Sequence, residues 1–289
     1  MNTVTAFFSR VRPALRGIPK VPLMILLVAI FAAVFADVLA LHNPEVGFPR
    51  DRLRPPFWQN GGNLKYPLGT DTMGRDVLTR IIYGTRISLT VAFFAVFLSA
   101  CVGTSIGVCA GFLGGWLDHV LMRVTDAWMS IPTVMFGVLL SIVVGQSVFN
   151  IVVIGTIVLW SRYARVVRGE TLSLKTRDFV HLASIAGVGK TRIMIRHIVP
   201  NVMNSVITLA SLQVGTVIVM EASLTFLGVG VPTPLPAWGL MLSEGKAGLF
   251  TGQWWLIVFP GVAIALLIVS FNLLGDWLRY RLDPHLSYL

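Results

Sequence analysis

The feature that most constrains this chain is a series of apolar runs, each long enough to cross a bilayer as a helix. Such a helix needs about 20 mainly apolar residues, and about six runs approach that length. They are residues 21–41, 87–113, 117–144, 149–167, 201–227 and 254–274. Charged residues make up only 12% of the chain, against roughly 25% in soluble domains. The sequence therefore predicts an all-α polytopic membrane protein.

The distribution of Lys and Arg indicates which side of the membrane each loop occupies. With a cytoplasmic N-terminus, 15 of the 23 basic residues fall in cytoplasmic segments and 8 fall outside. Basic residues accumulate in cytoplasmic loops, so we expect both termini and the polar stretch 177–201 in the cytoplasm. The net charge of +10 then reflects contact with anionic membrane lipid rather than nucleic acid.

Residues 1–20 are expected to form a cytoplasmic segment, because Arg10, Arg12 and Arg16 precede the first apolar run. A cleaved signal peptide begins with similar charge. However, the run 21–41 is long enough to span the membrane, and no small-x-small cleavage site ends it. We therefore interpret this run as a retained signal-anchor span, followed by an outer loop that extends to residue 86.

A long polar stretch, residues 177–201, separates two of the apolar runs. Asp178 is a suitable N-cap for a short helix that reaches Ala186, because a side-chain oxygen there accepts from free backbone N–H groups. Gly187 and Gly189 are expected to end that helix, and Pro200 is expected to start the next span. A short helix held on the membrane surface between two spans is suited to receiving force from a soluble partner.

This stretch resembles the coupling loop of ABC-importer permease subunits, whose pattern is Glu-Ala-Ala, three residues, Gly and a later Pro. The Gly position is Gly187 and the Pro position is Pro200. The first three positions are His181, Leu182 and Ala183, so the first two depart from the pattern. The resemblance implies a helix at about 178–187 that contacts an ATPase subunit. The residues implied in that contact are Asp178, His181, Leu182, Ala183, Ala186 and Gly187.

Two outer segments resemble the dipeptide, oligopeptide and nickel branch of these permeases. Residues 66–89 read YPLGTDTMGRDVLTRIIYGTRISL, in which Asp76 is placed to cap the following helix. We favour a structural cap on the outer face over a substrate site for this segment. The second, residues 221–245, contains Glu221, Trp238 and Gly239, which are candidates for the path or its outer gate. Glu221 is costly in lipid, so it either lines the outer mouth or hydrogen-bonds the following loop.

The resemblance implies a type I ABC-importer permease with core residues 87–284 and a tail at 285–289. It implies a heterodimer with a second permease, two ATPase subunits that bind ATP and Mg²⁺, and a periplasmic or lipoprotein solute-binding protein. Alternating access driven by the ATPases would then carry dipeptides or oligopeptides inward. This chain would hold no cofactor and have no enzyme activity of its own.

Three alternatives stay open for the function. Nickel and glutathione importers share these motifs, so the substrate is not fixed by them. A secondary transporter is disfavoured because no span carries the buried charge pairs of a proton-coupled carrier. A scaffold without transport activity is a further alternative.

Residues 187–191 (GVGKT) resemble the end of a phosphate-binding loop, but that motif needs a preceding strand, and we reject nucleotide binding here.

Several local features within the spans give further expectations. Gly103, Gly107 and Gly111 are four residues apart, a spacing that lets helices approach closely, and we expect them to serve packing inside this chain. Pro132 should bend the third span. Cys101 and Cys109 lie in one apolar run and should pack as small apolar side chains.

Charged residues near the span ends also give expectations. Arg123 and Asp126 are three apart and are placed to pair on one helix face. Arg162, Arg165 and Arg168 share a face that we expect to meet lipid headgroups or the acidic surface of a partner.

Overall fold

The computed structural model describes residues 17–282, and nearly all of the regular structure in this part of the chain is helical. Within these residues the only β pairing is an isolated bridge between Thr70 and Asp76. The N-terminal arginines Arg10, Arg12 and Arg16 and the tail at 285–289 lie outside the described residues. The all-α architecture expected from the apolar runs is thus confirmed.

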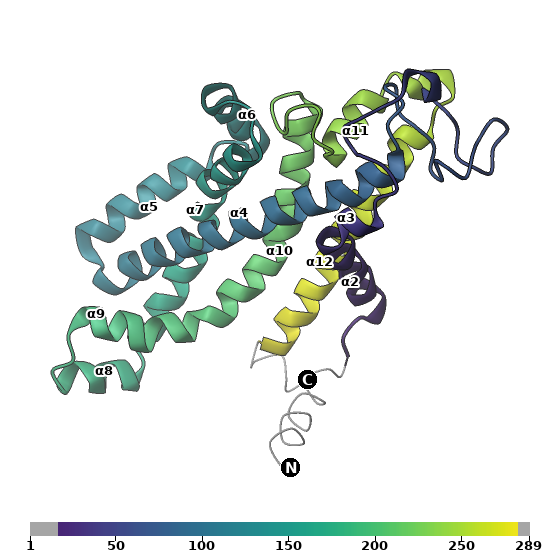
Figure 1. The fold of residues 1–289 in the computed structure, drawn as a ribbon. Helices are drawn as coiled ribbons and strands as arrows, with labels where there is room; N and C mark the ends of the chain where they lie inside the picture. Colours follow the sequence, from purple (N-terminus) through teal and green to yellow (C-terminus); the bar gives the residue numbers. More distant parts are fainter. Residues whose placement is uncertain (1–16, 283–289) are drawn as a thin grey trace, which may run out of the picture.

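The helices cross repeatedly between the two ends of the molecule, one carrying α8 and the other α11 (Figure 1). They are α2 (Lys20–Val34), α3 (Ala36–Leu39), α4 (Val77–Leu113), α5 (Gly115–Met129), α6 (Thr133–Val144), α7 (Val148–Lys175), α8 (Asp178–Ile185), α9 (Lys190–Ile193), α10 (Val199–Phe226), α11 (Trp238–Gly245) and α12 (Trp255–Leu282). Short 3₁₀ turns lie at Pro49–Asp51 and Gly248–Thr251, and a π-helical turn, η2, lies at Met194–Ile198.

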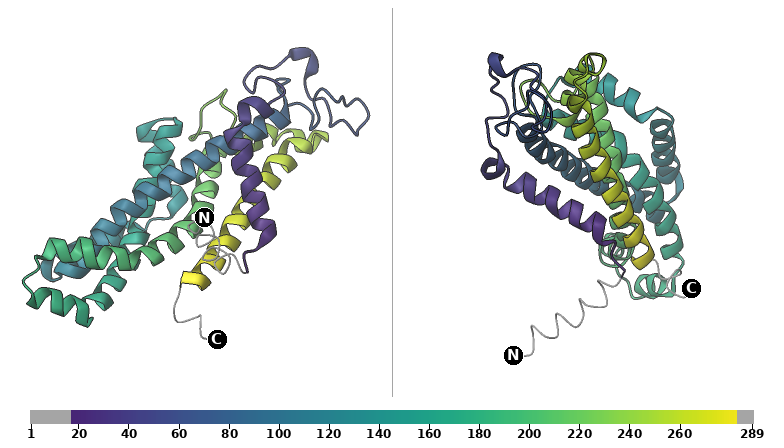
Figure 2. Two further views of the ribbon diagram at one scale, coloured as in Figure 1. Left: turned by 60° about the horizontal axis from the view of Figure 1, so that its bottom comes forward. Right: turned by 90° about the vertical axis from the view of Figure 1, so that its right-hand side faces the viewer.

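Within residues 17–282, four helices are long and apolar enough to cross a membrane: α4, α7, the continuous helix Lys190–Phe226, and α12. The pair α5 and α6 passes the same test only as one span bent by 92°. Helix α2 is apolar but has 15 residues, and Figure 2 shows it on the outside of the bundle beside α4 and α12. The expected spans are therefore present as four long helices, one bent pair and one short helix.

The expected bend at Pro132 is confirmed, although it is a break between two helices rather than a kink in one. Helix α5 ends at Met129, and α6 begins directly after Pro132, whose ψ of 125° lies outside the helical region. Proline lacks an N–H and clashes with the preceding turn, which favours a break or a kink at this position.

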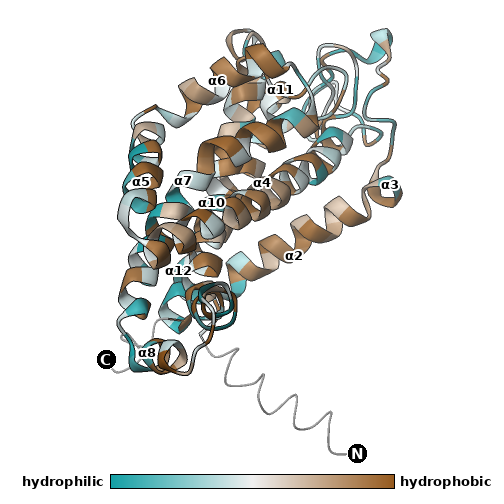
Figure 3. Ribbon diagram, turned by 90° about the vertical axis from the view of Figure 1, so that its left-hand side faces the viewer, coloured by the Kyte–Doolittle hydropathy of each residue, from teal (hydrophilic) through white to brown (hydrophobic). Residues whose placement is uncertain are grey.

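The long helices extend well beyond their apolar runs at one end each, where polar residues cap or continue them. Asp76 accepts hydrogen bonds from the backbone N–H groups of Leu78 and Thr79, so α4 begins at Val77 rather than near residue 87. The expected cap at Asp76 is thus confirmed. Helix α12 continues to Leu282, and Figure 3 shows polar residues at the ends of otherwise apolar helices.

Helices α4 and α7 form the most extensive helix pair of the bundle, and the three glycines of α4 lie at their interface. A Cβ atom added to Gly103 would stand 2.3 Å from the carbonyl oxygen of Trp160, and one added to Gly107 would stand 2.7 Å from that of Ala164. Gly111 faces Thr171 in the same way. The expectation that these glycines serve packing inside the chain is confirmed.

We predict that Gly103→Ala lowers the stability of the purified protein by about 1–3 kcal/mol, because the added methyl group forces α4 and α7 apart. Gly169→Ala is the matched control, since a Cβ there meets nothing within 4 Å. It should be neutral or stabilising by up to about 1 kcal/mol through helix propensity. Thermal unfolding in detergent measures both, and equal midpoints for the two variants would contradict this packing role.

Both ends of the described chain lie at the same end of the bundle as α8. A Cβ added to Gly17 would lie 3.8 Å from Nε1 of Trp277, near the end of α12. Figure 1 shows α8 and α9 at this end, and α11 with the long loop before α4 at the other. This arrangement agrees with the count of basic residues, which placed both ends of the chain and the stretch 177–201 on one side of the membrane and the loop before residue 86 on the other.

Candidate functional site

The coupling segment expected from the sequence is a helical turn between two long helices. Helix α8 begins at Asp178, one residue earlier than expected, because Arg177 takes the extended N-cap conformation. Asp178 is therefore the first helical residue and not the N-cap, and no side-chain hydrogen bond caps α8. Its carboxylate in the first turn still interacts favourably with the positive end of the helix dipole.

Gly187 ends α8 as the sequence predicts. Its φ of +78° lies in the left-handed region that glycine adopts without strain. The N–H of Val188 donates to the carbonyl of Ala183 at 3.1 Å, and that of Gly187 donates to Ser184 at 3.0 Å. This pair of bonds is the Schellman arrangement, which satisfies the last carbonyls of a helix. The end of α8 is therefore fixed by local hydrogen bonds.

One face of α8 holds it against the bundle. Val180 is buried in an apolar cluster with Val167 of α7, Ile193 of α9 and Val202 of α10. Ala183, one turn further along α8, packs against the same cluster. Movement of α8 would therefore be passed directly to the two long helices that flank it in the chain.

The opposite face of α8 is apolar and exposed. Leu182 is 65% exposed and Ile185 is 82% exposed, and Phe179 beside them is 38% exposed. Exposed apolar side chains gathered in this way mark a surface that a partner covers. We call Phe179, Leu182 and Ile185 the α8 patch.

Of the six coupling residues expected from the sequence, five are exposed and one is not. Ala183 faces the bundle and is half-buried, so it is placed to support α8 rather than to contact a partner. The exposed five are Asp178, His181, Leu182, Ala186 and Gly187. Sequence reasoning missed Phe179 and Ile185. The three-residue spacing of Leu182 and Ile185, next to polar neighbours, was the available signal.

Pro200 is the second residue of α10, as the sequence predicts for the start of the next span. Helical structure nevertheless leads into α10 from Lys190 through η2, so Lys190–Phe226 forms one long helix. A π-helical turn, η2, precedes the proline, and the N–H of Val199 donates to the carbonyl of Met194. This wider turn accommodates a residue that has no N–H of its own. Lys190 begins a helix here, and the described residues that precede 187–191 form helix α8 rather than a strand.

The arginines of α7 bond within the chain, contrary to the expectation that they meet lipid or a partner. Arg168 makes a two-pronged bond to Asp118 of α5, at 2.6 and 2.7 Å. Arg165 pairs with Asp126 of α5, so the expected pair of Arg123 with Asp126 is wrong. Helix α5 packs alongside α7, which offers these carboxylates a closer partner than their own helix does.

Arg162 is the third of these arginines and lies near the middle of α7. It donates to Oε1 of Gln213 at 3.0 Å, and to Thr133 at 3.5 Å. The guanidinium group of Arg162 therefore points toward α10 and the bend between α5 and α6. All three arginines thus orient α7 against its neighbours.

Glu221 lies fully buried near the outer end of α10, as its cost in lipid requires. It accepts from the hydroxyls of Ser88 on α4, at 2.9 Å, and Thr225, at 3.1 Å. Thr225 in turn accepts from the N–H of Val231 in the following loop. The carboxylate therefore connects α4, α10 and that loop, and its role in gating stays a prediction.

Trp238 and Gly239 form the start of α11 and pack tightly on the same two helices. The indole N–H of Trp238 donates to the carbonyl of Ile81 on α4, at 3.1 Å. A Cβ on Gly239 would lie 2.4 Å from the carbonyl oxygen of Ala222 on α10. The three outer candidates, Glu221, Trp238 and Gly239, are thus brought together where α4, α10 and α11 meet.

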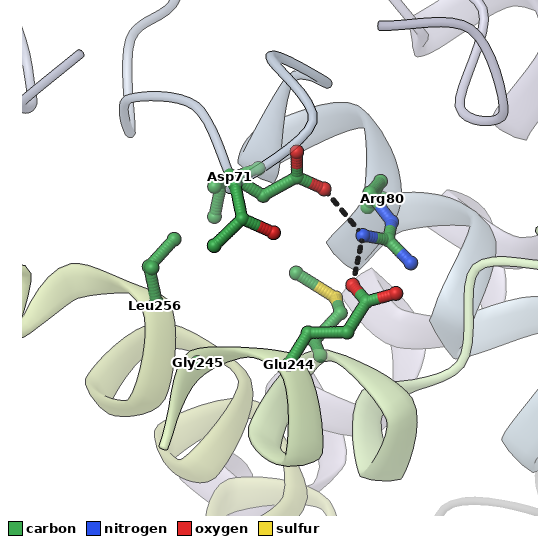
Figure 4. A pocket seen from close by; sticks show the side chains of 8 residues that line it. Asp71, Arg80, Glu244, Gly245 and Leu256 are labelled. Carbon is green, nitrogen blue, oxygen red and sulfur yellow. Dashed lines mark hydrogen bonds and ion pairs between the residues drawn. The ribbon is translucent and has the colours of Figure 1, made fainter. Parts of the chain in front are cut away.

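A buried network of two arginines and two carboxylates joins the outer loop to α4 and α11, and sequence reasoning missed it. Arg80 donates through one nitrogen to Asp71 at 2.5 Å and to Glu244 at 2.7 Å, as Figure 4 shows. Arg75 reaches the same two carboxylates at 2.7 and 2.8 Å. Both arginines are at most 1% exposed. We call these four residues the outer ion network.

The outer loop is further secured on its own surface. Tyr66 donates to Asp51 at 2.9 Å, and this bond, with the charges of Arg54 and Lys65, lowers the pKa of the Asp51 carboxyl. Thr70 accepts from the N–H of Arg54 at 2.8 Å. The expectation that residues 66–89 include a structural cap on this face agrees with these contacts.

Comparison with known proteins places these features in a family. The family of binding-protein-dependent transport system inner membrane components matches residues 103–288. The chain is 38% identical to the dipeptide transport system permease protein DppC of Haemophilus influenzae, over 97% of this chain and 93% of the relative. It is 36% identical to the glutathione transport system permease protein GsiD of Escherichia coli O6:K15:H31, over 91% and 85% of the two chains.

Proposed function

Because the chain belongs to the family of binding-protein-dependent transport system inner membrane components, we propose that it is a permease subunit of an ATP-driven importer for short peptides. It lies in the inner membrane with both termini and α8 in the cytoplasm. A second permease subunit completes the path, and an extracytoplasmic solute-binding protein delivers the substrate. Two partner ATPases bind ATP and Mg²⁺ and hydrolyse the nucleotide.

The α8 patch is the observation that carries this proposal. It presents apolar side chains at the polar end of the bundle, where an exposed patch needs a soluble partner to cover it. The other face of α8 packs on α7 and α10, so closure of an ATPase pair would move both helices. Because α10 also carries Glu221, such a movement would reach the outer candidates and could open the path to one side of the membrane at a time.

Peptides are the proposed substrate class, with glutathione as the second candidate. The relatives support this choice, since one is named for dipeptide transport and another for glutathione transport. Glutathione is itself a short peptide, so the two candidates share a free ammonium group and carboxylates. A nickel importer, a secondary transporter and a scaffold have no comparable support among these relatives.

Reconstitution tests the proposal. The chain is purified with its partner subunits, placed in proteoliposomes with the solute-binding protein outside, and supplied with ATP inside. We expect accumulation of a labelled tripeptide with ATP and none with a non-hydrolysable analogue. Uptake that continues without the ATPases would favour a secondary transporter, and assembly without any uptake would favour a scaffold.

A further inference from the structure

A groove of about 740 Å³ opens between α7, α10 and α12 at the end of the bundle that carries α8. Helix α10 packs against both α7 and α12 and forms the floor of the groove. Ligand pockets in proteins commonly have volumes of about 300–1,000 Å³. The groove is therefore large enough for a peptide of a few residues.

The floor of the groove is polar, although it belongs to a helix of membrane-crossing length. Asn201, Asn204, Ser205 and Thr208 of α10 all line it. Their spacing of three and four residues places them on one helix face. Polar side chains in such a helix are costly unless they face protein or water, so this face of α10 indicates an aqueous passage.

Glu170 of α7 supplies a negative charge to the groove. It is half-buried, and its carboxylate accepts a hydrogen bond from the hydroxyl of Ser205. Among the described residues it makes no ion pair, whereas Asp118 and Asp126 of the neighbouring α5 each pair with an arginine of α7. Glu170 thus has acceptor capacity that the chain itself leaves unused.

A positive charge lines the same groove from the opposite wall. Arg279 of α12 is exposed and contributes to the lining, and it does not pair with Glu170. A ligand with a positive group at one place and a negative group at another is complementary to this arrangement. The single carboxylate and the neutral amides and hydroxyls do not form the set of imidazole or thiolate ligands that suits nickel.

We propose that this groove is the inner part of the substrate path, and that Glu170 binds the ammonium group at the free amino terminus of a peptide. The ammonium group has three donors, which match the carboxylate of Glu170 and the side-chain oxygens of Asn201 and Asn204 nearby on α10. Arg279 receives the carboxylate of the same peptide. This proposal rests on the proposed function, and it names the groups that the substrate contacts.

Cysteine protection in the complete transporter tests the proposal directly. Cys101 and Cys109 are replaced by alanine, and Ser173→Cys places a thiol in the groove at an exposed lining position that has no part in the proposed binding. Without ATP, trialanine should slow alkylation of this thiol. Glu170→Gln should raise the peptide concentration for half-protection about 10- to 100-fold, the usual effect of losing a charged hydrogen bond. Acetylating the peptide's amino terminus should have a similar effect.

The combination of the two changes separates direct contact from a structural effect. If Glu170 binds the ammonium group, acetylated trialanine should protect the thiol equally with and without the Glu170→Gln substitution, so the two effects should not add. Asp276→Asn, an exposed carboxylate of α12 outside the groove, is the matched control and should change nothing. The proposal would be overturned if neither Glu170→Gln nor acetylation of the peptide changed the peptide concentration needed for half-protection of the thiol.

Two other results would also decide the question. A thiol at position 173 that resists alkylation with and without peptide would show that a partner subunit fills the groove, and the proposal would be wrong. ATP-dependent uptake by the unaltered transporter is measured alongside. If uptake is normal but Glu170 has no effect on protection, the groove proposal is wrong and the proposed importer function stands. If no peptide is taken up at all, the proposed function itself is wrong.

Discussion

Replacing Leu182 and Ile185 together with aspartate is expected to abolish ATP-driven uptake while leaving the chain folded. Both side chains are largely exposed, at 65% and 82%, and neither belongs to the apolar cluster that holds α8, so the change should disturb the bundle little. Buried apolar anchors at an interface are often worth about 2 kcal/mol or more each, so losing two should weaken ATPase binding at least about 100-fold. Co-purification of the ATPases with this chain measures the loss.

Phe250→Asp is the matched control for this double substitution. Phe250 is 91% exposed but lies in the 3₁₀ turn between α11 and α12, at the opposite end of the molecule. The ATPases should co-purify with this variant as with the unaltered chain. If the double variant retained its ATPases and its uptake, α8 would not be the coupling element.

Arg80→Gln is expected to cause the largest loss of stability of any single charge substitution in the outer face. The side chain is fully buried and bonds Asp71 and Glu244 together. Its removal leaves the buried carboxylate of Asp71 and the half-buried carboxylate of Glu244 with Arg75 as the remaining guanidinium of the outer ion network. Breaking a buried pair in this way costs about 3–5 kcal/mol. Thermal unfolding of the purified protein, with chemical denaturation as a second measure, should show the loss.

A compensating substitution distinguishes charge balance from packing. Arg80→Leu combined with Glu244→Gln removes one charge of each sign and leaves Arg75 paired with Asp71 at 2.7 Å. This double variant should recover much of the lost stability, because no carboxylate is left unpaired. Arg52→Gln, at an exposed position of the outer loop, should stay within about 0.5 kcal/mol. A double variant as unstable as Arg80→Gln would contradict the charge argument.

The features that sequence reasoning placed correctly depend on neighbours in the chain. Asp76 caps α4 because its oxygens reach N–H groups two and three residues ahead. Gly187 ends α8 through its own positive φ, a conformation that glycine adopts without strain and that needs no distant partner. The apolar runs predicted the long helices for the same reason. The length of a run can be read from consecutive residues and compared with the thickness of a bilayer.

The features that were missed or wrong depend on partners far apart in the sequence. Arg168 and Asp118 are separated by 50 residues, and Arg75 and Glu244 by 169. The nearer pairing of Arg123 with Asp126 was plausible from spacing alone, but α7 brings Arg165 to Asp126 instead. The spacing of Leu182 and Ile185 indicates that the two side chains share a face of α8, but which face points outward depends on the packing of Val180 and Ala183 against α7 and α10.

The central claim is that the α8 patch contacts an ATPase subunit on the cytoplasmic side, and a photo-cross-linking residue at position 185 measures this most directly. In the assembled transporter, irradiation should join this chain to the ATPase, identified by mass spectrometry of the adduct. The same residue at position 250 should give no such adduct. An adduct with the solute-binding protein from position 185, or no adduct with any subunit, would contradict the account.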